Sequence, residues 1–114
     1  MDNIVIYVTY IHYHHGNHIY NNYIGVCGLI TPWNHPMLIA VKKIAPAIAT
    51  GNSIVVKPSE LAPVSVLELG AVCSKAGLPD GVLNIVPGFG KEVGQLLCTH
   101  PAVRKVNHIY TVYR

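Results

Sequence analysis

The chain has 114 residues, which is room for one domain. Hydrophobic residues make up 51% of it and charged residues only 11%, a composition that excludes an intrinsically disordered chain and indicates surfaces that meet partners. The formal net charge of +3 is too small for a nucleic-acid-binding surface, so no nucleic-acid partner is expected. No apolar stretch reaches the roughly 18 residues that a membrane span needs, so no membrane partner is expected either.

The three cysteines, Cys27, Cys73 and Cys98, cannot all pair with one another and follow no metal-ligand spacing. Reduced thiols in a cytoplasmic compartment are the simplest interpretation. The amino terminus lacks the basic flank and cleavage site of a signal peptide.

The two ends of the chain differ in composition from its middle. All seven tyrosines lie at or before position 23 or at or after position 110, and Asn-His-Ile-Tyr occurs at 17–20 and again at 107–110. We therefore predict a low-complexity segment at 1–23, a globular segment at 24–106 and a tail at 107–114 that, like the first segment, lies outside the globular one. One hypothesis is that both ends are translated non-coding DNA. Four histidines within residues 12–18 lack supporting carboxylates, so no metal site is predicted.

Between residues 24 and 106, apolar runs typical of strands alternate with helix-period segments. Asn34 is a suitable helix cap and Pro36 a suitable first helical residue. The predicted strands cover 23–30, 53–57, 82–86 and 103–106, and the predicted helices cover 36–51, 63–77 and 91–98.

This alternation, with strands apolar on both faces, predicts the α/β class: a Rossmann-like parallel sheet with helices on both faces. Ligands of such sheets bind beyond the carboxyl ends of the strands. Three motifs fall there: Thr31-Pro-Trp-Asn34, Lys57-Pro-Ser-Glu60 and Gly88-Phe-Gly90.

Each motif has a functional and a structural interpretation. The Asn34 amide can stabilise a developing oxyanion or cap the following helix. Lys57 and Glu60 can hold the two hydroxyls of a ribose, with Glu60 opposing a 2′-phosphate and favouring NAD over NADP, or they can form an exposed ion pair. The glycines Gly88 and Gly90 can let the backbone approach a ligand closely, or they can form an ordinary turn.

Taken together, these segments resemble the aldehyde dehydrogenases over residues 24–106. The resemblance is carried by Ile24-Gly-Val-Cys-Gly-Leu-Ile-Thr-Pro-Trp-Asn34, Lys43-Ile-Ala-Pro-Ala-Ile-Ala-Thr-Gly-Asn52, Val55-Val-Lys-Pro-Ser-Glu60 and Ala76-Gly-Leu-Pro-Asp-Gly-Val-Leu-Asn-Ile-Val-Pro-Gly-Phe-Gly90, in family order.

The resemblance implies an enzyme that oxidises an aldehyde to a carboxylic acid with NAD as cofactor, NADP being possible, and a homo-oligomeric parent enzyme. The sheet would be a partial, truncated piece of the family's Rossmann-like domain. Asn34 would be the catalytic oxyanion donor, Lys57 and Glu60 would bind the adenosine ribose, Ser59 would be a further cofactor-binding residue, and Gly90 would lie near the adenine. The cofactor cleft would be lined by Ile30, Thr31, Pro32 and Trp33.

The sequence also departs from the family. The family's catalytic cysteine and general-base glutamate belong to stretches downstream of any present here, and Asn107-His-Ile-Tyr110 replaces a cofactor-contacting turn. An oxyanion donor without a nucleophile cannot perform acyl-enzyme chemistry, so we expect a dehydrogenase fragment that is inactive alone. The alternative is a non-catalytic nucleotide-binding or subunit-interaction module with an unpaired sheet edge.

Overall fold

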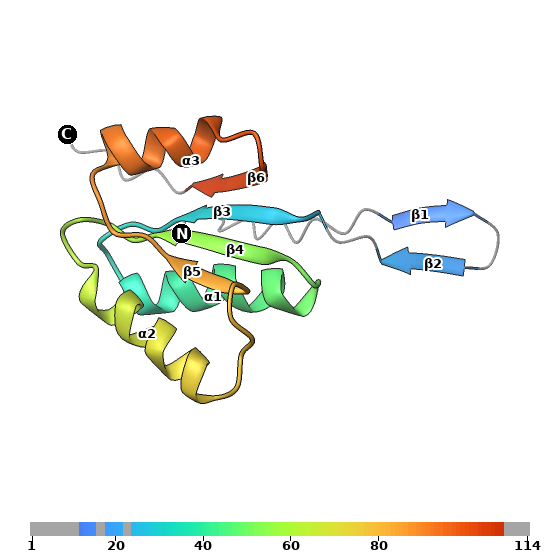
Figure 1. Cartoon of the computed structure of the whole chain (residues 1–114), viewed down its shortest axis with the longest axis horizontal. Coiled ribbons are helices and arrows are strands. Elements are labelled where there is room, and N and C mark those ends of the chain that lie inside the picture. Colours follow the sequence, from blue (N-terminus) through green and yellow to red (C-terminus); the bar gives the residue numbers. More distant parts are fainter. Residues whose placement is uncertain (1–11, 16–17, 22–23, 109–114) are drawn as a thin grey trace, which may run out of the picture.

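The computed structural model describes residues 12–15, 18–21 and 24–108, and side chains are described for 24–108. Figure 1 shows a sheet with helices on both sides of it. The strands are β1 (His12–His15), β2 (His18–Asn21), β3 (Val26–Ile30), β4 (Ser53–Lys57), β5 (Leu83–Ile85) and β6 (Val103–His108). The helices are α1 (Pro36–Ala49), α2 (Val64–Lys75), the π-helix η1 (Gly90–Gly94) and α3 (Gln95–Thr99).

Four strands form one parallel sheet in the order β5-β4-β3-β6. The chain moves from β3 through β4 to β5 and then returns to the other side of β3 as β6. The sheet therefore has a switch point between β3 and β6, and ligands of open parallel sheets bind beyond the carboxyl ends of the strands at such a point. The predicted α/β fold with a partial Rossmann-like sheet is confirmed.

The main core lies between the sheet and the helices α1 and α2, which occupy the same side of it in Figure 1. Alternate residues of a strand share a face, so β3 and β4 turn one set of side chains into this core. The fully or nearly fully buried members are Leu29, Ala40, Ile44, Ile54, Val56 and Val66.

The opposite face of the sheet is covered by α3 (Figure 1). This helix approaches β3 closely at Gly28. A Cβ atom added to Gly28 would come within 2.9 Å of Leu97 Cγ, closer than real Cβ contacts. Leu97 therefore occupies the space that a side chain on β3 would fill, and this contact brings α3 close to the sheet.

Both long helices end as their glycines predict. Gly51 follows α1 with φ +77°, Gly77 follows α2 with φ +89°, and the chain beyond each bonds back to the last helical turn. The side chain of the buried Asn52 then fixes the entry of β3, because its Oδ1 accepts the backbone N–H groups of Ile24 (2.7 Å) and Gly25 (3.1 Å).

The structure corrects three local predictions. Asn34 does not cap α1: the N-cap is His35, in the left-handed conformation with φ 51°, and no side chain caps the helix there. The predicted helix 91–98 is instead the π-helix η1 followed by the short α3. The fourth strand continues two residues beyond Val106, to His108, because these residues pair with Leu29 and Ile30.

Residues 12–15 and 18–21, which include the histidine cluster, form the antiparallel pair β1 and β2. The side chains of this cluster lie outside the described part of the structure. Within the described residues, the three cysteines are free thiols, no group of three or more His, Cys, Asp and Glu is placed to hold a metal ion, and no helix is both long and apolar enough to cross a membrane.

Candidate functional site

The carboxyl ends of three strands lie in one row. Ile30 of β3 pairs with Lys57 of β4 on one side and with His108 of β6 on the other. The Thr31 N–H donates a hydrogen bond to the Lys57 carbonyl (3.1 Å), which keeps the segments after β3 and β4 together as they leave the sheet. Residues 31–34 and 57–60 therefore share one edge of the sheet, as the sequence predicted.

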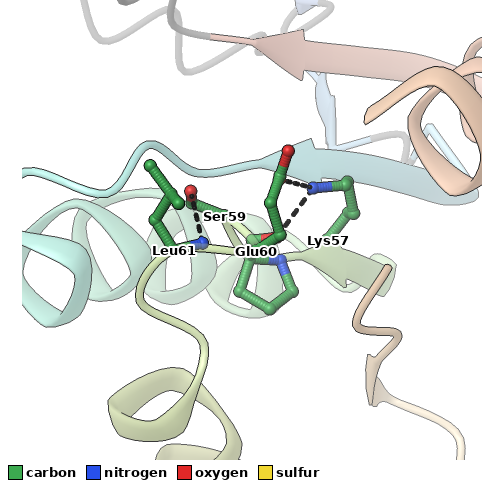
Figure 2. Close-up of polar contacts among 5 residues, drawn as sticks. Lys57, Ser59, Glu60 and Leu61 are labelled. Atoms are coloured by element: carbon green, nitrogen blue, oxygen red, sulfur yellow. Dashed lines mark hydrogen bonds and ion pairs between the residues drawn. The ribbon is translucent and has the colours of Figure 1, made fainter. Parts of the chain in front are cut away.

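Lys57 is a buried cation at this edge, with only 3% of its side chain exposed. Its Nζ donates to the Pro58 carbonyl (2.9 Å) and to Glu60 Oε2 (3.1 Å). Figure 2 shows the Lys57 and Glu60 side chains turned toward one another. A side chain at Gly94 of η1 would meet the Lys57 stem 3.8 Å away, so the lysine lies between the end of β4 and η1.

Glu60 is the solvent-facing partner of this pair, with 42% of its side chain exposed. Its own backbone N–H and the hydrogen bond from Lys57 hold the pKa of the carboxyl below its usual value, and the backbone of Gly90 lowers it further. The structure thus brings together Lys57, Glu60 and Gly90, which the sequence predicted separately. An ionised carboxylate beside a lysine ammonium presents an acceptor and a cation to the same ligand.

Ser59 takes a local structural part in the same turn. Its Oγ accepts the N–H of Leu61 at 3.3 Å, as Figure 2 shows. This bond shapes the turn that carries Glu60.

The segment after β3 changes from buried to exposed along its length. Ile30 is half-buried and Thr31 and Pro32 are buried, whereas Trp33 and Asn34 are exposed. Within the described part of the chain, the buried Thr31 Oγ1 has no hydrogen-bond partner. With His35 as the N-cap, the exposed Asn34 lies one position too early to cap α1.

Lys43 is a feature of this edge that we did not predict. Its Nζ donates to the carbonyls of Ile30 (2.5 Å) and Asn107 (3.1 Å), at the ends of β3 and β6. Burial lowers the pKa of Lys43 to about 8. Burial and the positive charges of Lys43 and Lys57 also lower the pKa of His108. The signal in the sequence was the helical spacing, which places Lys43 in the buried stripe of Ala40, Ile44 and Ala47.

None of the cysteines lies on the two loops that form the site. Cys27 is buried in β3, Cys73 is half-buried on α2, and Cys98 is exposed on α3. Burial raises the pKa of the Cys27 thiol, which disfavours the thiolate that a nucleophile requires.

A parallel sheet with a switch point, together with a lysine-glutamate pair and an exposed amide at its carboxyl edge, is typical of the α/β domains that bind nucleotides. A model of the aldehyde dehydrogenase family matches residues 5–109. The chain belongs to the aldehyde dehydrogenase family, and the resemblance predicted from its motifs is confirmed.

Curated relatives from plants are more than half identical to this chain. Aminoaldehyde dehydrogenase 2, peroxisomal, of Pisum sativum is 57% identical over 90 residues, which cover 79% of this chain and 18% of the relative. Betaine aldehyde dehydrogenase, chloroplastic, of Beta vulgaris has the same identity and coverage. The chain therefore spans about a fifth of the length of the curated relatives it matches.

Solved structures of the family share its fold. A mutant of aldehyde dehydrogenase C from Pseudomonas syringae, in complex with NAD+ and octanal, is 51% identical with a TM-score of 0.72, covering 73% of this chain and 17% of that one. Betaine aldehyde dehydrogenase from Staphylococcus aureus, in complex with NAD+, is 44% identical with a TM-score of 0.71 and the same coverage.

Proposed function

We propose that this chain is part of the nucleotide-binding domain of an NAD-dependent aldehyde dehydrogenase, and that Lys57 and Glu60 bind the adenosine ribose of NAD. The observation that carries the proposal is the ion pair at the end of β4, in which Lys57 is buried and Glu60 is largely open to solvent. A ribose presents two neighbouring hydroxyls, which suit one donor and one acceptor held side by side.

The residues present fit this cofactor. The Glu60 carboxylate is ionised and accessible, and its negative charge opposes a 2′-phosphate, which favours NAD over NADP. Gly90 lies beside the carboxylate and suits a position near the adenine. The NAD+ bound in the similar structures of the P. syringae and S. aureus enzymes supports the same cofactor here.

The remaining predicted site residues have distinct proposed roles. Residues 30–33 line the cofactor cleft at the switch point, and Ser59 holds the turn that presents Glu60. The Asn34 amide donates a hydrogen bond to the oxyanion formed when a thiolate attacks an aldehyde. NAD supplies the hydride acceptor for that reaction. The thiolate itself is not provided by Cys27, Cys73 or Cys98, which lie away from these loops.

We propose an aldehyde as the substrate of the complete enzyme, and an amino- or betaine aldehyde in particular. The names of the curated relatives, aminoaldehyde and betaine aldehyde dehydrogenases, support this substrate class. Homo-oligomeric assembly of that enzyme and a cytoplasmic location stay predictions. The relatives named as peroxisomal or chloroplastic offer two other compartments to test.

A second candidate function is non-catalytic, and the open edges of the sheet favour it. Among the described strands, β5 and β6 each pair on one side only, and an unpaired edge can recruit another strand. This candidate predicts association with full-length subunits. The boundaries 1–23, 24–106 and 107–114 also stay a proposal, with the family match running across residues 5–109.

The test is a calorimetric titration of the 114-residue chain with NAD and NADP. We expect the wild type to bind NAD saturably. Glu60→Gln should weaken NAD binding roughly tenfold, which corresponds to the loss of about one charge-assisted hydrogen bond. The variant should also have a smaller preference for NAD over NADP than the wild type. The matched control is Glu68→Gln, at an exposed carboxylate on α2, which should leave both affinities unchanged.

The same samples also test catalysis. With an aminoaldehyde and NAD we expect no NADH formation by the chain alone, because no activated thiol accompanies Asn34 in the described site. Turnover that Asn34→Ala abolishes would contradict this expectation. Absence of NAD binding, with a cooperative unfolding transition intact, would overturn the proposed ribose site.

A further inference from the structure

Lys43 is a buried cation whose position the ribose site does not explain. It lies in the middle of α1, among the residues that pack against the sheet, and is 9% exposed. Within the described residues, Nζ is paired with no carboxylate. Burying an ammonium group without a counter-ion is costly, so its hydrogen bonds must offset that cost.

Those hydrogen bonds join two strands. Nζ donates to the Ile30 carbonyl at 2.5 Å and to the Asn107 carbonyl at 3.1 Å. Ile30 ends β3, and Asn107 is the penultimate residue of β6, the neighbour of β3 across the switch point. A single side chain therefore bridges the two strand ends between which the ligand crevice of such a sheet opens.

We propose that Lys43 is a positioning residue of the nucleotide site, which ties the carboxyl ends of β3 and β6 together. Through Ile30 it fixes where residues 31–34 leave the sheet, and through Asn107 it fixes the end of β6 that carries His108. This inference rests on the proposed function, since it assigns Lys43 to the same nucleotide site. Lys43 is not a catalytic residue here, because its ammonium is committed to backbone carbonyls.

The alternative is a general structural role, in which Lys43 stabilises the whole domain equally. The two roles predict different parts of the sheet that lose stability when Lys43 is replaced. A bridge between strand ends protects the ends of β3 and β6 locally, whereas β5 lies at the far edge of the sheet, beyond β4. β5 therefore reports the stability of the domain apart from the bridge.

The first experiment is amide hydrogen exchange without NAD on the wild type, Lys43→Met and the matched control Lys42→Met. Lys42 is the exposed neighbour of Lys43 on α1. We expect Lys43→Met to lower the protection of residues 27–31 and 103–108 at least tenfold more than that of residues 83–85, and Lys42→Met to change none of them. Unchanged protection, or an equal loss in all three segments, would overturn the proposal.

A second measurement uses the wild type only and stands even if Lys43→Met does not fold. Hydrogen-bond scalar couplings should connect the Lys43 Nζ to the carbonyl carbons of both Ile30 and Asn107, whose oxygens accept its hydrogen bonds. Their absence would overturn the bridge.

NAD titration of the folded variants then tests the link to the site. We expect roughly tenfold weaker NAD binding by Lys43→Met and unchanged binding by Lys42→Met. Unchanged affinity of Lys43→Met beside a local loss of protection would remove Lys43 from the nucleotide site. Failure of the wild type to bind NAD would instead count against the proposed function, while the exchange data would still decide the bridge.

Discussion

Glu60 and Lys57 form an ion pair with one buried and one exposed partner. The lysine is buried and gives up two of its donors to the protein, whereas the carboxylate keeps an exposed face. A pair of this exposure contributes little to stability. Its value lies in holding an ionised acceptor at the carboxyl edge of the sheet.

Replacing Lys57 should raise the pKa of Glu60. In Lys57→Met the carboxyl loses a hydrogen bond and a neighbouring positive charge, so its pKa should move up toward the usual value of 4.5. A carbon-13 NMR titration of the Glu60 carboxyl measures the change, with Lys91→Met, at an exposed lysine of η1, as control. Because the folded-state pKa is lowered, the contribution of Glu60 to stability is present above about pH 4.5 and is lost as the pH falls through the folded pKa. An unchanged Glu60 pKa in Lys57→Met would show that the pair does not form.

The residues of the proposed ribose site could be predicted from the sequence because each follows a strand whose apolar pattern is clear. Lys57 and Glu60 come directly after the buried β4, and parallel strands bring their carboxyl ends to one edge. Lys43 escaped prediction because a lysine in an amphipathic helix is normally exposed. Its long side chain reaches two carbonyls that are 13 and 64 positions away, and a local pattern carries no signal of such partners.

Gly28 sets the spacing between β3 and α3. Leu97 occupies the position of the missing side chain, and both residues are buried. Since η1 runs directly into α3, the contact between Gly28 and Leu97 also influences the distance between η1 and the Lys57 side chain. A small residue in a strand thereby influences the site from the opposite face to the main core.

Gly28→Ala should destabilise the domain by about 1–3 kcal/mol, the usual cost of overpacking. The added methyl would meet the branch point of Leu97 at 2.9 Å, so the whole leucine side chain has to shift. Gly94→Ala is the matched control, because its Cβ would make an ordinary contact at 3.8 Å with the flexible Lys57 stem. Urea denaturation measures the free energy of unfolding of both variants. Equal stabilities of the two variants would contradict the proposed spacing role.

The elements themselves were largely predictable, and the misses have local causes. β4 has the predicted limits because Pro58 ends its ladder. The helix at 91–98 was predicted as one regular element, but Phe89 O accepts hydrogen bonds from Glu92, Val93 and Gly94, which widens the first turn into η1. The predicted cap at Asn34 is wrong because the N-cap is His35, in a left-handed conformation that a sequence pattern rarely indicates.

At the scale of the whole molecule, the burial of Lys43 should make the free energy of unfolding depend on pH. Its pKa is lowered from 10.5 to about 8 on folding, so the unfolded chain binds more protons between these values. The free energy of unfolding of the wild type, relative to Lys43→Met, should therefore rise with pH between about 8 and 10.5, by up to about 3 kcal/mol.

Urea denaturation of both proteins at several pH values measures this difference. The other titratable groups described at this edge, His108, Lys57 and Glu60, are present in both proteins. The pKa of His108 is lowered from 6.5 and that of Glu60 from 4.5, so both groups titrate below this pH window. A difference that stays flat across the window would mean that Lys43 is not buried as an ammonium group.

The strand order also has a consequence for the order of synthesis. β3 is made before the other three strands of the parallel sheet, and β6 is made last, yet the two are neighbours. On the ribosome, β3, α1 and β4 can pack as soon as they emerge. The other edge of β3 stays unpaired until β6, which begins at Val103, has been synthesised. A nascent chain stalled before that point would expose this edge, and completing the sheet requires closure of a long loop, a slow step in folding.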